Sequence, residues 1–160
     1  MYDTKIDLPE RTRSKVTKLL NERLADAIDL GGQTKHAHWN VKGPHFIALH
    51  ELFDKVAENV EEHIDEIAER ITSLGGTAHG TIAVVAKTTS LAPYPDDITE
   101  GPDHVQALSA ALGDFGKKIR KAIDQADKLE DAGTADLFTQ ISRDVDKYLW
   151  FLEAHLQAKR

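Results

Sequence analysis

The strongest constraint on the fold is a run of apolar residues at positions 46 to 74, which recur at alternating steps of three and four. This spacing places them along one face of a helix of about 30 residues. The run stops at Gly75 and Gly76, and glycine commonly ends helices. Because such a helix has a long apolar stripe, it needs other helices to cover it. The apolar positions are Phe46, Leu49, Phe53, Val56, Val60, Ile64, Ile67, Ile71 and Leu74.

Three further segments carry the same helical spacing. The first begins at Pro9 and runs to about His38, and residues 40–44 interrupt it. Another follows Gly101 and Pro102, and the last follows Thr134, which we expect to be its N-cap. Alternating strand patterns of useful length are absent from the sequence, so we predict an all-α fold, a four-helix bundle.

The connection between the second and third of these segments has about 25 residues, enough to cross the length of a bundle. Within this long crossover we expect a short helix or a buried contact over residues 81–86. Residues 92–95 contain two prolines and should be extended. No repeat or linker divides the chain, so we expect a single domain over residues 1–160, with residues 1–8 as an N-terminal tail.

The composition limits the cellular compartments and the binding partners that we expect for this protein. Cysteine is absent, which excludes disulfides and thiolate metal sites and favours a reducing cytoplasm. No apolar run is long enough for a membrane span, and the first residues lack the features of a signal peptide. The net charge of −7, from 27 acidic and 20 basic residues, attracts cations and disfavours nucleic acid.

Two pairs of metal-competent side chains lie on the second helical segment, His50 with Asp54 and Asp65 with Glu69. Each pair is spaced i, i+4, so both of its members project from one face. The pairs are roughly 16 Å apart along the helix and cannot hold the same ion. They also lie away from the apolar stripe, so we expect them on the outside of the bundle, although any single pair could be an ordinary solvated surface.

An internal two-metal site of the usual kind is disfavoured, because it uses Glu-x-x-His pairs and none occurs in this sequence. If two copies of the second helix pack antiparallel about a two-fold axis near Asn59 and Val60, the first pair of one copy faces the second pair of the other. Histidine nitrogen combined with carboxylate oxygen suits Fe(II), Mn(II) or Zn(II).

Residues 35–40, 46–54, 65–70 and 142–151 resemble the Dps family of starvation-induced mini-ferritins. The resemblance implies a ferritin-like four-helix bundle and a hollow homo-dodecamer. It also implies that Fe(II) is oxidised, preferentially with hydrogen peroxide, and stored as ferric mineral, which protects against oxidative damage. The two-iron ferroxidase centres would lie at dimer interfaces, and their ligands would be His38, His50 and Asp54 of one subunit with Asp65 and Glu69 of the other.

The resemblance also suggests roles for residues outside the set of metal ligands. Trp39 would lie beside the centre, where it either captures stray oxidising equivalents or anchors the interface. We expect Trp150 to serve packing, and His36 and His63 either to orient metal ligands or to lie on the surface. Candidates for an acidic, iron-admitting pore are Asp136 with Glu130 or Asp131, which could equally be ordinary acidic residues at a helix start.

DNA binding is the property in the family's name, and it commonly depends on a lysine-rich terminal tail. Here only Lys5 precedes Pro9, and Lys159 with Arg160 forms a short basic end. Together with the negative net charge, this predicts weak or absent DNA binding. The alternatives are a DNA-compacting protein in which iron oxidation is secondary, and a passive cage without redox turnover.

Overall fold

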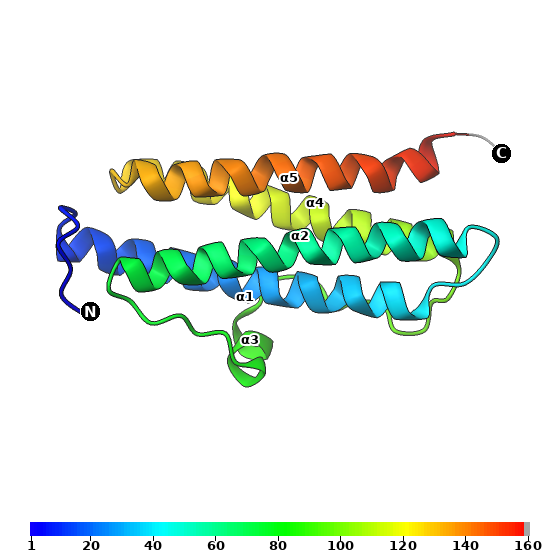
Figure 1. Ribbon diagram of the computed structural model, residues 1–160, viewed down its shortest axis with the longest axis horizontal. Coiled ribbons are helices and arrows are strands. Elements are labelled where there is room, and N and C mark those ends of the chain that lie inside the picture. The colour runs from blue at the N-terminus through cyan, green and yellow to red at the C-terminus, as the bar shows by residue number, and fades with distance from the viewer. Residues whose placement is uncertain (159–160) are drawn as a thin grey trace.

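Five α-helices make up the protein, whose computed structural model describes residues 1–158. They are α1 (Glu10–Asn40), α2 (Phe46–Ser73), α3 (Ile82–Thr88), α4 (Gly101–Lys128) and α5 (Ala132–Gln157). Four of them run side by side as a bundle, and the short α3 lies outside it (Figure 1). No strand occurs within residues 1–158, so the predicted all-α class is confirmed.

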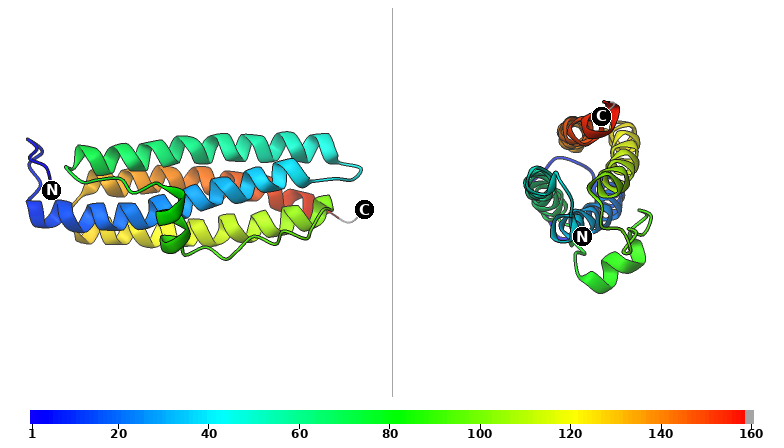
Figure 2. Two further views of the ribbon diagram at one scale, coloured as in Figure 1. Left: turned by 90° about the horizontal axis from the view of Figure 1, so that it is seen from below. Right: turned by 90° about the vertical axis from the view of Figure 1, so that its right-hand side faces the viewer.

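The bundle is built from two antiparallel pairs, α1 with α2 and α4 with α5, which the end-on view separates clearly (Figure 2). The end of α2 and the start of α4 lie at opposite ends of the bundle (Figure 1). The chain between them therefore travels the length of the bundle, as the long connection predicted. The short helix expected at residues 81–86 is α3, although Val85 is the one residue of it that is buried.

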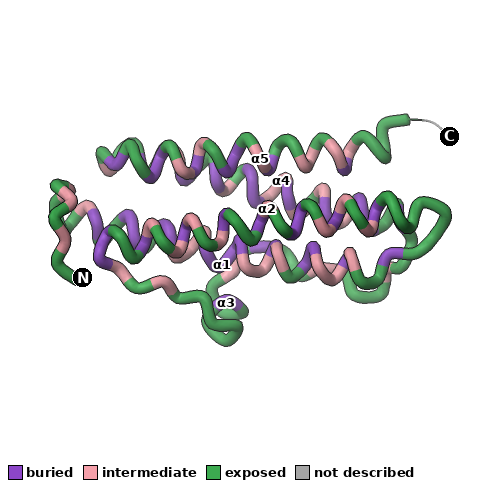
Figure 3. Tube along the Cα trace, viewed as in Figure 1, coloured by how far each residue is buried: buried purple, intermediate pink, exposed green. Residues whose placement is uncertain are grey.

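The core follows the apolar stripes, so each bundle helix is buried along one face and exposed along the other (Figure 3). Phe53 of α2, Phe115 of α4 and Phe138 of α5 are buried at its centre. On α2 the stripe is buried from Leu49 onward, apart from the partly exposed Ile64. Phe46, at the first position of α2, is 43% exposed.

The start of α5 differs from the sequence prediction. Thr134 is not the N-cap: the helix begins at Ala132, and Asp131 caps it by accepting hydrogen bonds from the Thr134 backbone N–H at 3.0 Å and hydroxyl at 2.7 Å. The Asp131 carboxylate also binds Arg70 of α2 at 2.8 Å. A carboxylate that both caps a helix and neutralises an arginine is a better cap here than a hydroxyl three residues later.

Polar side chains on α1 fasten the crossover to the bundle. The buried Asp26 carboxylate accepts hydrogen bonds from the Ser90 backbone N–H and hydroxyl, at 2.7 and 3.0 Å. One turn along, Asp29 accepts from the Thr89 hydroxyl at 2.7 Å, and Gln33 donates to a crossover carbonyl at 3.0 Å. These contacts hold a long irregular segment in one place.

The N-terminal residues fold back onto the end of α2. The Tyr2 backbone N–H donates to the Gly75 carbonyl at 2.7 Å. The buried Arg13 guanidinium donates to the carbonyls of Leu74, Tyr2 and Leu8, at 2.8, 3.2 and 3.2 Å. Gly75 has a φ of +85°, a conformation that glycine adopts without strain. The segment expected as a tail is therefore an arm bound to the bundle.

Candidate metal centre

His38 at the end of α1 and His50 in the second turn of α2 form a reciprocal pair. The Nδ1 atom of each lies 2.8 Å from the backbone carbonyl oxygen of the other, and the rings stack with centroids 3.7 Å apart. A carbonyl oxygen only accepts hydrogen bonds, so both Nδ1 atoms carry the proton. In the neutral form of each ring the lone pair then lies on Nε2, the form in which histidine binds metals.

Asp54 lies one turn further along α2, beside this pair. Its Oδ1 is 2.5 Å from the Lys35 ammonium nitrogen of α1 and 3.9 Å from His38 Nδ1. The hydrogen bond from Lys35 is the main cause that lowers the pKa of Asp54, and partial burial opposes it. The carboxylate is therefore ionised at neutral pH, and it is paired with the Lys35 ammonium. Lys35 stands one turn before His38, but no spacing in the sequence indicated its contact with Asp54.

Asp65 and Glu69 occupy the same helix further along, and both are exposed, as predicted. The predicted outward position is only partly correct for the other pair. His50 and Asp54 are half-buried, because they lie against His38 and Lys35 at the seam between α1 and α2.

The two sets of side chains do not come together within one chain. Along α2 they are roughly 16 Å apart, and no group of three histidine or acidic residues placed to hold a metal occurs within residues 1–158. Between the sets, Glu58, Glu61 and Glu62 line a shallow hollow with Asp65. This acidic face attracts cations, but a site with more than two or three protein ligands needs residues from elsewhere.

His63 and His36 contact residues other than the proposed ligands. His63 is only 2% exposed, so the expectation of a surface histidine is wrong for it. Its Nδ1 lies 3.0 Å from Glu66, and its Nε2 lies 3.4 Å from Asp144 of α5, so it joins α2 to α5. His36 packs edge-on against Tyr94 of the crossover, with ring centroids 5.4 Å apart.

The two tryptophans are both on the surface of the subunit. Trp39 is 70% exposed directly after His38, and its role stays a prediction. Trp150 is 61% exposed on the subunit and touches Phe151, and its packing role stays a prediction.

The three candidate pore residues separate into two groups. Asp131 is 2% exposed and its carboxylate is occupied by Arg70 and by the cap of α5, so it is not available to line an acidic pore. Glu130 and Asp136 are exposed nearby and stay candidates. The basic pair Lys159 and Arg160 lies outside the described residues.

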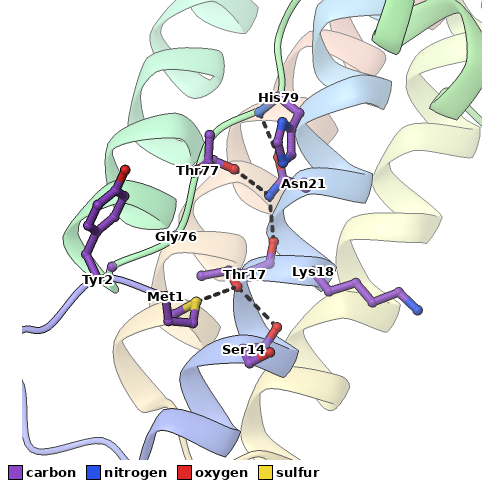
Figure 4. A pocket seen from close by; sticks show the side chains of 10 residues that line it. Met1, Tyr2, Ser14, Thr17, Lys18, Asn21, Gly76, Thr77 and His79 are labelled. Atoms are coloured by element: carbon purple, nitrogen blue, oxygen red, sulfur yellow. Dashed lines mark hydrogen bonds between the residues drawn. The ribbon is translucent and has the colours of Figure 1, made fainter.

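A separate hollow of about 530 Å³ lies beside the N-terminal arm, between α1 and the end of α2 (Figure 4). Its lining includes Met1, Thr17, Lys18 and Asn21, and His79 is its one metal-competent side chain. Without a carboxylate in its lining, this hollow is not a metal centre.

Comparison with known proteins shows the family of this chain. A family model described as a ferritin-like domain matches residues 17–160. A relative from Agrobacterium fabrum, named DNA protection during starvation protein, is 52% identical over 99% of this chain and 98% of its own length. The chain belongs to the Dps family. None of the helices within residues 1–158 is both long and apolar enough to cross a membrane.

Solved Dps structures share the whole fold. The Mycobacterium smegmatis Dps structure has a TM-score of 0.93 at 33% identity and covers 99% of this chain and 95% of its own. A Dps protein from Vibrio cholerae, described as a member of a broad superfamily of ferritin-like diiron-carboxylate proteins, has a TM-score of 0.90 at 27% identity, with 98% of each chain covered. The predicted ferritin-like bundle is thereby confirmed.

Proposed function

We propose that this chain is the subunit of a cytoplasmic homo-dodecameric cage that oxidises Fe(II) and stores the ferric product. Its two-iron ferroxidase centres would form between two antiparallel α2 helices. One subunit would supply His38, His50 and Asp54, and its partner would supply Asp65 and Glu69. The observation that carries the proposal is the separation of two incomplete ligand sets along α2, one at its seam with α1 and the other exposed.

The ligands suit Fe(II) as a substrate. In their neutral form the two imidazoles would present Nε2 lone pairs, and the carboxylates supply hard oxygen ligands, a combination that binds Fe(II) while leaving positions open for an oxidant. Asp54 is ionised before the ion arrives, so binding need not wait for proton release. The acidic hollow between the sets favours entry of cations over anions.

Hydrogen peroxide is the oxidant that we propose. Two Fe(II) ions can each give one electron to one peroxide molecule, which takes up two protons and leaves as two waters. Delivery of both electrons at one centre avoids hydroxyl radical, the product of one-electron reduction. For Trp39, which is exposed next to His38, we propose that it either captures stray oxidising equivalents or anchors the subunit interface.

DNA compaction is the alternative function, because several relatives are named for DNA protection during starvation. Two features of this chain favour protection through iron chemistry instead. The N-terminal arm is bound to the bundle through Arg13 rather than extended, and the net charge of −7 repels phosphate. We therefore propose that DNA binding is weak or absent.

The test is Fe(II) titration with hydrogen peroxide, followed by ferric absorbance and particle mass. Asp65→Asn with Glu69→Gln should slow iron oxidation sharply while the cage still assembles. Asp124→Asn with Asp127→Asn removes the same charge from exposed positions on α4 and should leave the rate unchanged. Near-normal oxidation by the first variant would refute the assignment, and a wild-type protein that consumes no peroxide would refute the function.

A further inference from the structure

A tyrosine and a buried histidine are hydrogen-bonded where the crossover meets α4, outside the candidate metal centre. The Tyr94 hydroxyl oxygen lies 2.7 Å from His104 Nδ1, and His104 is fully buried. Tyr94 also packs against His36 of α1. The crossover runs along the bundle at this point (Figure 2), so the pair joins three separate parts of the chain.

The direction of this hydrogen bond depends on the tautomer of His104, and we take Tyr94 as the donor. The phenol hydrogen needs an acceptor in a partly buried site, since an unpaired donor there is costly. Nδ1 of His104 is the acceptor within reach. A neutral imidazole that accepts at Nδ1 carries its own proton on Nε2, and this Nε2 is buried with no hydrogen-bond partner among residues 1–158. Tyr94 therefore donates to a nitrogen that is free to take up a proton.

Both groups are neutral at rest. Burial raises the pKa of Tyr94 above its ordinary value and lowers the pKa of His104. Proton transfer alone would place a phenolate and an imidazolium in the interior, which is unfavourable. Loss of an electron from the phenol changes this, because the oxidised ring is a strong acid and the histidine is the base beside it. The electron and the proton then leave the phenol together.

The surroundings make Tyr94 different from the other tyrosines. Tyr2 is 74% exposed and Tyr148 is half-buried, and within residues 1–158 neither hydroxyl faces a hydrogen-bonded histidine. The sequence has no cysteine and its single methionine is Met1, so the bundle lacks oxidisable sulfur. Tyr94 also lines a surface groove of about 270 Å³, through which a small oxidant reaches the ring.

We propose that Tyr94 and His104 form a redox-active site that accepts one oxidising equivalent from a small one-electron oxidant, such as the carbonate radical. The Tyr94 ring gives one electron to the oxidant, which is reduced to carbonate. The phenol O–H bond breaks, and the proton forms an N–H bond at His104 Nδ1. An electron from Fe(II), which becomes Fe(III), and return of the proton restore the pair.

The test uses iron-free protein, so its result is independent of the ferroxidase proposal. A photo-oxidised ruthenium tris-bipyridyl complex with persulfate supplies the oxidant, and the frozen sample is examined by electron paramagnetic resonance. Wild-type protein should give a neutral tyrosyl radical. Tyr94→Phe, which keeps the ring, should lose this signal, and Tyr148→Phe should keep it. The proposal is overturned if the signal survives in Tyr94→Phe or vanishes in Tyr148→Phe.

A second variant separates redox chemistry from packing. His104→Asn leaves Tyr94 in place and removes the base, so the yield of the tyrosyl radical should be lost although the phenol is present. An unchanged yield would show that His104 does not accept the proton, and that the pair only fastens the crossover.

Discussion

Replacing Lys35 with methionine should strengthen the binding of a divalent metal by His38, His50 and Asp54. The Lys35 ammonium lies 2.5 Å from Asp54 Oδ1, so it occupies a position that a metal ion would need. Both side chains are about two-fifths exposed, at 41% and 39%, so a water-like dielectric applies. At about 4 Å in water, repulsion between a +1 and a +2 charge corresponds to a roughly thirtyfold change in a dissociation constant.

The measurement is calorimetric titration of the assembled protein with Co(II), which does not react as Fe(II) does with oxygen. We expect Lys35→Met to tighten binding roughly ten- to thirtyfold, and Lys35→Arg, which keeps the charge, to leave it weak. Lys55→Met is the matched control, because Lys55 follows Asp54 in the sequence and is exposed. Equal changes in both methionine variants would mean that overall charge, not the contact with Asp54, limits binding.

Three shorter predictions concern stability and DNA. Asp131→Asn should lower the free energy of unfolding, measured with denaturant, by roughly 2–4 kcal/mol. The loss should be smaller than for a fully buried ion pair because Arg70 is 24% exposed. Asp136→Asn, at an exposed site, should change this free energy little. Burial lowers the pKa of His104 from its ordinary value of 6.5. As the pH falls through 6.5, the unfolded chain therefore binds a proton at this histidine before the folded chain does, and the free energy of unfolding should fall. His104→Gln should remove this pH dependence of the free energy of unfolding, whereas His79→Gln, at an exposed site, should keep it. Gel retardation at physiological salt should show little DNA binding, and a tight complex would contradict this.

The fold was predictable because its determinants are local. Long stripes of apolar residues fix the helices, and the length of the crossover fixes the topology. The attachment of the crossover was not predictable, because Asp26, Asp29 and Gln33 look like a solvated helix face until the crossover lies over them. The predicted N-cap of α5 was wrong for a related reason. Asp131 is favoured over Thr134 by Arg70, which comes from a different helix and a distant part of the sequence.

The candidate site was predictable where it depends on helical spacing and not where it depends on contact between helices. The i, i+4 pairs on α2 follow from the sequence. The stacked histidines and the ion pair of Lys35 with Asp54 require the register of α1 against α2, which no local pattern supplies. The burial of His104 did have a signal, because it stands four residues before Leu108 and continues the apolar stripe of α4. His63 likewise lies three residues after Val60, in register with the stripe of α2.

Metal sites shared between two subunits should respond to the mixing of two inactive variants, whereas sites within a single subunit should not. One inactive variant carries His50→Ala and Asp54→Ala, and another carries Asp65→Ala and Glu69→Ala. When the two are disassembled, mixed equally and reassembled, about half of the dimers should be mixed, and each mixed dimer has one intact site and one doubly damaged site. About a quarter of wild-type ferroxidase activity should therefore return. Each variant reassembled alone is the control and should stay inactive. If mass spectrometry finds mixed dimers and no activity returns, the sites lie within single subunits, because mixing leaves such sites damaged.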